Sequence, residues 1–394
     1  TLSVNDQYDE VEKAFAQVDF TNDLEWGHIV TLKAGVRYNE DTTDHTQIRH
    51  ADNRDGTAGW TLADFARSGG DDLYVVPGFT YVNNTLPPLN GTFTQVDFDQ
   101  LLQQFPRDTR EVEQRYNESY LVEEKTYAAY VQFDLDGQMF GLPYRGNFGL
   151  RYYNTDLTSS GWLDQAGTQT GQVKRSYSDW LPSLNLTLVM NEDLLLRVGA
   201  ARVMARPDQD DLALAGTYNL TEETARVGNP FLDPFQANTF DLSLEWYMND
   251  AGILQGGIFY KDIDSFISNG QIPGGVPVDI GDGNIVIFDA VGPINGDGGK
   301  VQGVEASYQQ VFSALPGFWG GFGTQLNYTY TDSDVSIPYF EGGLTFSMPL
   351  EGLSENSANL VLFWENETFS ARAAYNYRDS FLSNRSNTQG NPEF

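Results

Sequence analysis

The sequence predicts an all-β protein, an antiparallel transmembrane β-barrel of which about twelve strands are present. Three observations predict this class. Apolar and polar residues alternate in long runs, the runs exceed the length of ordinary strands, and the connections between them are alternately short and long. Because successive strand side chains point to opposite faces, each run has one apolar and one polar face.

The alternation is clearest in four runs, at residues 30–39, 129–136, 240–247 and 369–378. In the second run, Val131 and Phe133 alternate with Gln132 and Asp134. Strands of globular proteins average about 5–6 residues, whereas a tilted strand that crosses a bilayer needs about 9–11. The alternative, a soluble antiparallel sandwich, is disfavoured because the polar face is continuous in Asn, Asp, Gln, Ser and Arg.

The lengths of the connections also predict a barrel, because short turns alternate with long loops along the chain. Short turns are predicted at residues 21–24, 136–138, 191–193, 249–252, 315–317 and 365–367. Long polar loops are predicted at about 42–120, 155–172, 204–235, 268–300 and 332–353. Six short turns imply six hairpins, and a membrane barrel carries its long loops on the extracellular side. We therefore expect residues 1–394 to form one partial barrel domain.

Composition excludes several function classes. The 394 residues include 55 Asp and Glu but 23 Lys and Arg, so the formal net charge is −32. That balance excludes nucleic acid as a partner, because binding a polyanion needs a basic face. The absence of cysteine excludes disulfides and thiolate metal sites. The chain starts at Thr1 without a start methionine or signal peptide, so we expect a processed product or a fragment.

The sequence gives no reason to expect an enzyme or a catalytic residue. The Gly-x-Ser-x-Gly elbow and the phosphate-binding loop are absent, and acidic pairs such as Asp71-Asp72 are expected by chance among so many carboxylates. One group of residues hints at a transition-metal site: Asp41, Asp44, His45, His50 and Asp52. Its spacing matches no known zinc pattern, so we expect a solvated charge cluster and no metal.

Calcium is an alternative to the expected absence of any cofactor. Three Asp- and Gly-rich stretches offer carboxylates and backbone carbonyls, at residues 52–56, 279–283 and 295–299. None of them fits the twelve-residue calcium loop, so turn chemistry explains them first.

The predicted ligand-binding residues are aromatic side chains in the long loops: Trp60, Tyr74, Tyr81, Trp162 and Tyr218. Trp and Tyr present a flat apolar face beside a polar group, which suits recognition of the C–H faces of sugar rings. The alternative is that each aromatic ring anchors the packing of its own loop.

Several stretches in order resemble one family. They are residues 179–186, 196–207, 228–234, 238–247, 259–267, 301–305, 327–333 and 373–378. The chain resembles the C-terminal barrel of TonB-dependent outer-membrane receptors, particularly the group associated with carbohydrate uptake. The resemblance implies a closed barrel of about 22 strands, filled by an N-terminal plug domain that is absent from this chain. By strand parity the chain corresponds to about strands eight to nineteen.

An open sheet of twelve strands would leave two unpaired edges in lipid. We therefore expect residues 1–394, expressed alone, to give no heat-modifiable monomeric barrel. Residues 387–393 lack alternation, and we interpret them as a loop that is cut short.

The resemblance implies a receptor of the bacterial outer membrane that takes up a scarce nutrient, an oligosaccharide in this subgroup. Loops and plug would bind the ligand, and the TonB complex would supply energy through the plug. Further implied partners are outer-membrane lipid, lipopolysaccharide and a surface lipoprotein. The alternatives are a siderophore or iron-chelate receptor of the same family, a passive porin, and a secreted carbohydrate-binding β-protein. Acidic loops would repel anionic ferric chelates.

Overall fold

The computed structural model describes residues 3–51, 111–280, 284–338 and 345–383. These residues form a single sheet of seventeen strands. The long strands are β1 (Ser3–Trp26), β2 (Ile29–Ala51), β4 (Tyr120–Met139), β5 (Leu142–Trp162), β6 (Thr170–Asn191), β7 (Leu194–Ala205), β10 (Phe235–Asn249), β11 (Gly252–Gln271), β13 (Ile285–Val311), β14 (Phe322–Pro338), β16 (Asn356–Glu365) and β17 (Ser370–Arg378). The short strands are β3 (Glu111–Gln114), β8 (Gly216–Asn219), β9 (Thr224–Val227), β12 (Val276–Asp279) and β15 (Thr345–Met348).

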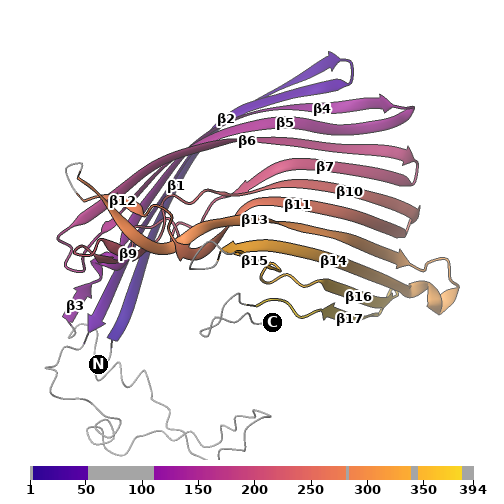
Figure 1. The fold of residues 1–394 in the computed structure, drawn as a ribbon. Helices are drawn as coiled ribbons and strands as arrows, with labels where there is room; N and C mark the ends of the chain where they lie inside the picture. Colours follow the sequence, from indigo (N-terminus) through magenta and orange to yellow (C-terminus); the bar gives the residue numbers. More distant parts are fainter. Residues whose placement is uncertain (1–2, 52–110, 281–283, 339–344, 384–394) are drawn as a thin grey trace, which may run out of the picture.

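The twelve long strands pair in chain order, each antiparallel to the next, and build one curved wall (Figure 1). In the described part of the chain, β1 pairs with β2 alone and β17 with β16 alone, so these two strands are the edges of the wall. The prediction of a partial antiparallel barrel of about twelve strands is confirmed. No helix in the described ranges has the length and apolar character that crossing a membrane requires.

Cross-strand register gives the wall two chemically distinct faces. One continuous row of partners is apolar: Leu32, Phe133, Phe148, Leu184, Ala200, Phe240 and Tyr260. A neighbouring row, on the opposite face, is mostly polar: Thr31, Asp134, Asn147, Asn185, Gly199 and Asp241. We call these the lipid face and the polar face. On the polar face Lys33 Nζ lies 2.7 Å from Asp134 Oδ2, so charges there pair with one another.

Two of the six short turns lie further along the chain than predicted. Strand β1 continues to Trp26 and turns at residues 27–28, not 21–24. Strand β4 continues to Met139 and turns at Phe140 and Gly141, not at 136–138. Both of these turn residues have positive φ, 55° and 82°, as a two-residue hairpin turn requires. The polar residues at the predicted positions belong to the ends of strands.

The long connections contain more strand than the sequence indicated. Strand β2 extends nine residues beyond position 42, and the β5–β6 connection comprises residues 163–169 alone. Strands β11 and β13 likewise extend into the range 268–300. The hairpins thus continue past the apolar band as paired ladders, because pairing with a neighbour satisfies the backbone wherever the strand goes. We call this end of the wall the long-loop end.

The alternation reverses where strands enter the long-loop end. In the part of β5 next to the short turn, Phe148 and Leu150 are exposed on the lipid face and Arg151 lies on the polar face. Beyond that point the polar face carries Tyr153 and Leu157, which are 3% and 2% exposed. Tyr153 follows Tyr152 in the chain but lies on the opposite face, where it is buried. Another part of the chain must therefore lie over the polar face at the long-loop end.

Candidate functional site

The segment between β7 and β10, residues 206–234, covers that face. We call it the inward segment; it includes the short strands β8 and β9. Leu212, Ala213 and Leu232 of the segment form a buried cluster with Tyr120, Val122 and Leu157 of β4 and β5. Burial of each leucine side chain in this cluster contributes about 1.5–3 kcal/mol to stability. The segment is therefore part of the wall's core at the long-loop end.

Arg206, at the start of the inward segment, contacts two strands of the wall. Its guanidinium lies 3.1 Å from Asp41 of β2 and 3.7 Å from Glu124 of β4, and donates a 2.8 Å hydrogen bond to Thr126. The Glu124 side chain is 3% exposed and also accepts a hydrogen bond from Tyr177 of β6. Removing Arg206 would leave a buried carboxylate without its cation, which is costly.

Further polar contacts fix the segment along its length. Tyr120 donates a hydrogen bond to Asp210, and Leu214 N donates to Ser159 Oγ over 3.1 Å. Burial, followed by the hydrogen bond to Asp210, raises the pKa of Tyr120. Burial and the neighbouring Asp208 and Asp210 also raise the pKa of Asp211. The segment thus carries acidic groups into a partly desolvated place.

The structure places Tyr218, a predicted ligand-binding residue, in a second buried cluster. Its ring packs edge-on against Phe288 at 5.2 Å between centroids, and its hydroxyl donates a 3.0 Å hydrogen bond to the Leu214 carbonyl. Burial raises the pKa of this hydroxyl. These contacts fit the alternative in which the aromatic ring anchors its own loop. Trp60, Tyr74 and Tyr81 lie outside the described residues.

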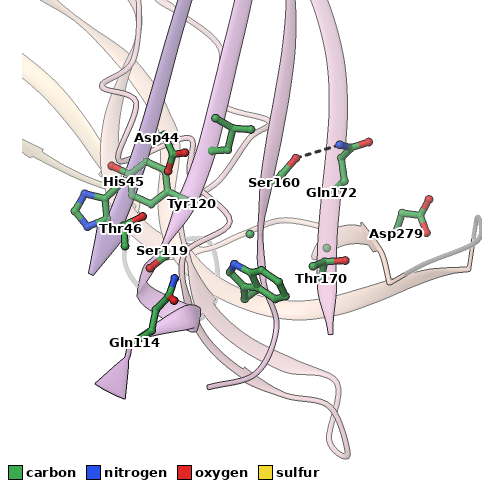
Figure 2. Close-up of a pocket in the computed structure, with 14 residues that line it drawn as sticks. Asp44, His45, Thr46, Gln114, Ser119, Tyr120, Ser160, Thr170, Gln172 and Asp279 are labelled. Atoms are coloured by element: carbon green, nitrogen blue, oxygen red, sulfur yellow. Dashed lines mark hydrogen bonds between the residues drawn. The ribbon is translucent and has the colours of Figure 1, made fainter. Parts of the chain in front are cut away.

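The other described candidate, Trp162, lines a pocket of about 570 Å³ at the long-loop end (Figure 2). We call it the rim pocket. It is lined by Asp44, His45, Thr46, Gln114, Ser119, Tyr120, Leu121, Ser160, Gly161, Trp162, Thr170, Gly171, Gln172 and Asp279. These residues come from six different strands and the chain beside them, so the structure alone brings them together.

Trp162 is held by a structured turn. Tyr116, in a 3-10 turn (Tyr116–Glu118), packs edge-on against the indole at 5.0 Å between centroids. Across the β5–β6 connection, Asp164 Oδ1 accepts hydrogen bonds from the backbone N–H groups of Thr168 and Gln169, at 2.8 and 3.1 Å. The hydrogen bond from the Thr168 side chain lowers the pKa of Asp164. The turn is therefore organised before any ligand arrives.

The predicted charge cluster around His45 is divided between different contacts. His45 Nδ1 lies 2.6 Å from Asp9 Oδ1, and the ring stacks on Tyr120 at 4.8 Å. The hydrogen bond with His45 lowers the pKa of Asp9. Asp41 contacts Arg206 instead. The described residues contain no group of three or more His, Asp or Glu side chains placed to hold a metal ion.

Sequence reasoning missed Asp44, Gln172 and Asp279 as pocket residues. They lie on β2, β6 and β12, and no spacing in the chain marks them. Arg206 carries a local signal, because the Arg206-Pro207 pair follows directly on the end of β7. Its ion pairs with Asp41 and Glu124 fix the inward segment to the wall.

A wall with one lipid face, one polar face and an inward-folded loop is the architecture of an outer-membrane β-barrel. The family model "TonB dependent receptor-like, beta-barrel" matches residues 3–394, and the chain belongs to this family. Members of the family are outer-membrane receptors and transporters of Gram-negative bacteria, not enzymes. No curated protein matches the sequence.

Solved structures of similar fold include the ferric citrate transporter FecA without ligand, at TM-score 0.59 and 11% identity, covering 98% of this chain and 44% of that one. The siderophore receptor PiuA from Acinetobacter baumannii aligns at TM-score 0.59 and 14% identity over 95% and 47% of the two chains. The ferric yersiniabactin uptake receptor FyuA from Yersinia pestis aligns at TM-score 0.56 and 10% identity, covering 98% of this chain and 45% of that one. The chain spans about half the length of these structures, and identities this low establish the fold alone.

Proposed function

We propose that this chain forms part of the barrel of an outer-membrane receptor that takes up a neutral oligosaccharide with energy supplied through TonB. Family membership supports energised uptake. The polar face would surround a plug and the ligand path, while the lipid face would contact lipid and lipopolysaccharide. A surface lipoprotein is a further proposed partner. No cofactor belongs to this proposal.

The observation that carries the ligand class is the pairing of arginines at the long-loop end. Arg206 pairs with Asp41, Arg202 with Asp179 at 2.9 Å, and Arg175 with Asp233. Their positive charge is neutralised within the wall, and the whole chain carries a net charge of −32. An anionic ligand would meet repulsion there. A neutral polyhydroxyl ligand needs only hydrogen-bonding side chains and aromatic faces.

A second candidate is uptake of a ferric chelate. The three solved structures are named for ferric citrate, a siderophore and ferric yersiniabactin, which favours an iron ligand. If this candidate is correct, cations beyond the paired arginines must supply the binding site.

The test is equilibrium binding by the complete receptor, purified from outer membranes in detergent. The panel contains maltohexaose, cellohexaose, xylohexaose, laminarihexaose and ferric citrate. We expect one hexasaccharide to bind with little dependence on salt, since a neutral ligand gains little from screened charges. We expect no change with EDTA; a loss would assign calcium to the site. Binding of ferric citrate alone would replace the oligosaccharide by the iron chelate.

Energised uptake is tested in cells. Uptake of the bound sugar should be lost on deleting TonB, whereas a passive porin would continue to admit it. A protein recovered in the aqueous phase without detergent would instead support the secreted carbohydrate-binding alternative.

A further inference from the structure

The rim pocket opens mainly on the outward side of the wall, and His45 and Tyr120, a cross-strand pair on the opposite face, line its inner edge. Asp44, Leu121, Ser160, Gln172 and Asp279 are successive cross-strand partners on β2, β4, β5, β6 and β12. All five line the pocket. They alternate with the residues that face the inward segment, so this row belongs to the same side as the lipid face.

Gly161 identifies the side of the wall that faces the inward segment. A Cβ placed on Gly161 would lie 2.8 Å from the Leu214 carbonyl oxygen, so the inward segment touches the wall at this residue and leaves no room for a side chain. Ser160, one position earlier, must point to the opposite side. The row that begins at Asp44 is therefore open to the cell exterior around the barrel, not to the ligand path inside it.

We propose that the rim pocket is a capture subsite for one neutral hexose unit on the outside of the barrel rim, with Trp162 as its stacking platform. The proposal rests on the proposed uptake of an oligosaccharide for the chemical class of the ligand. Its location and its residues are independent of that function.

The pocket has the chemistry that a sugar ring requires. Gln172 Nε2 donates a 3.0 Å hydrogen bond to Ser160 Oγ, which fixes the orientation of both polar groups beside the indole. Asp44 is an exposed carboxylate that accepts hydrogen bonds from hydroxyl groups. Among the described residues the lining contains no Lys or Arg. A phosphate or ferric chelate would find no permanent cation there, whereas hydroxyl groups find acceptors.

The stacking platform is rigid. Tyr116 supports the indole from one side. Gly167, in the turn after Trp162, has φ of 67°, and a Cβ there would approach the Tyr116 ring to 2.7 Å. The turn, the tyrosine and the tryptophan therefore fix one another, and a ligand pays little ordering entropy. The volume of about 570 Å³ falls within the usual range of small-molecule pockets, about 300–1,000 Å³.

A neutral hexose unit has two sources at this position. One is the oligosaccharide captured from the medium, and the other is the saccharide of lipopolysaccharide that surrounds the barrel in the outer leaflet. Both present the same ring and hydroxyl chemistry.

The experiment compares variants of the complete receptor in detergent. Trp162→Ala and Gly167→Ala should each weaken binding of the best hexasaccharide of the panel at least tenfold, and Trp162→Phe should restore most of it. Trp319→Ala is the matched control, because Trp319 is 60% exposed at the opposite end of the wall. Heat-modifiability of each variant reports whether the barrel has assembled. Purified lipopolysaccharide from the host strain is the second probe.

The outcomes separate the two proposals. A tenfold loss confined to the hexasaccharide assigns capture from the medium, and one confined to lipopolysaccharide assigns a surface saccharide. Unchanged affinity of an assembled Trp162→Ala receptor for both probes overturns the subsite but leaves oligosaccharide uptake standing. A wild-type receptor that binds neither probe overturns the subsite and the proposed function together. If Trp162→Ala does not assemble, the assembled Gly167→Ala or a Gln172→Leu receptor decides.

Discussion

The two halves of β5 show how one strand can serve two environments. In the half next to the short turns, apolar side chains such as Phe148 are exposed on the lipid face, and Asn147 and Arg151 lie on the polar face. In the half at the long-loop end, Leu157 is buried on the polar face, and Asp156 is exposed on the outward side. The exposed apolar side chains of the first half match the surface that a membrane barrel presents to lipid. Those of the second half are buried against the inward segment. Apolar residues therefore mark contact with apolar surroundings, and not one fixed side of the wall.

The largest effect is expected in the lipid-facing half. Leu242 of β10 is 40% exposed on the lipid face, and Ser243 is its neighbour on the polar face. Leu242→Arg places a charge in lipid at a cost of about 2–4 kcal/mol near the bilayer midplane. We expect it to abolish the heat-modifiable form in outer membranes, while Ser243→Arg retains it. Equal amounts of assembled receptor for the two variants would contradict the assignment of the faces.

At the long-loop end the largest effect is expected from Arg206→Met. It leaves Glu124 buried without its cation, at a local cost of about 3 kcal/mol. The barrel should assemble, but amides of residues 206–234 should exchange with deuterium faster. Adding Glu124→Gln should recover part of the protection, because it removes the unpaired charge. Unaltered exchange in the single variant would show that Arg206 does not hold the segment.

Leu157→Ala tests the apolar contact of the same segment. The side chain is buried against Leu212 and Leu232, and its truncation should cost about 2–3 kcal/mol. Limited proteolysis should cut the inward segment sooner in this variant. Thr158→Ala, one residue along on the outward side, is the control and should behave as wild type. Equal cleavage rates for the two would argue against a core at this end.

The smallest effect is expected from Asp211→Asn. Burial raises the pKa of Asp211 above its usual 3.8, so the folded segment favours the protonated carboxyl. Its stabilising contribution is complete below pH 3.8. The contribution is lost as pH rises through the raised pKa. At pH 7 the amide should therefore stabilise the segment by about 0.5 kcal/mol, and below pH 3.8 the gain should vanish. A variant that is less protected than wild type at pH 7 would contradict the raised pKa.

The fold was predictable because its main signal is local. Alternation such as that of Val131 to Asp134 depends only on neighbouring residues and on the pleat. The turn at Phe140 and Gly141 was misplaced because nothing in the alternation marks the residue at which a hairpin reverses. Tyr152 and Tyr153 look alike in sequence, yet Tyr152 faces outward, whereas Tyr153 is buried on the other face. There its ring packs against Tyr177, and its hydroxyl accepts a hydrogen bond from Gln236, 83 residues later.

The candidate site was predictable only in part. Trp162 was selected because it is an aromatic residue beside a turn, and it does line the rim pocket. Its partners Asp44, Gln172 and Asp279 carry no signal, because cross-strand register alone makes them neighbours. Tyr218 was predicted on the same ground as Trp162, as an aromatic residue in a long loop. It packs against a buried hydrophobic cluster instead of lining the rim pocket.

The sequence by itself determined that the strands are two-faced, long and about twelve in number, since side-chain alternation and strand length are properties of adjacent residues. Only the tertiary structure decided which apolar residues contact the inward segment instead of lipid, and which polar residues meet at the rim. Both outcomes depend on pairing between strands that are distant in the chain, where a shift of one residue moves every side chain to the other face.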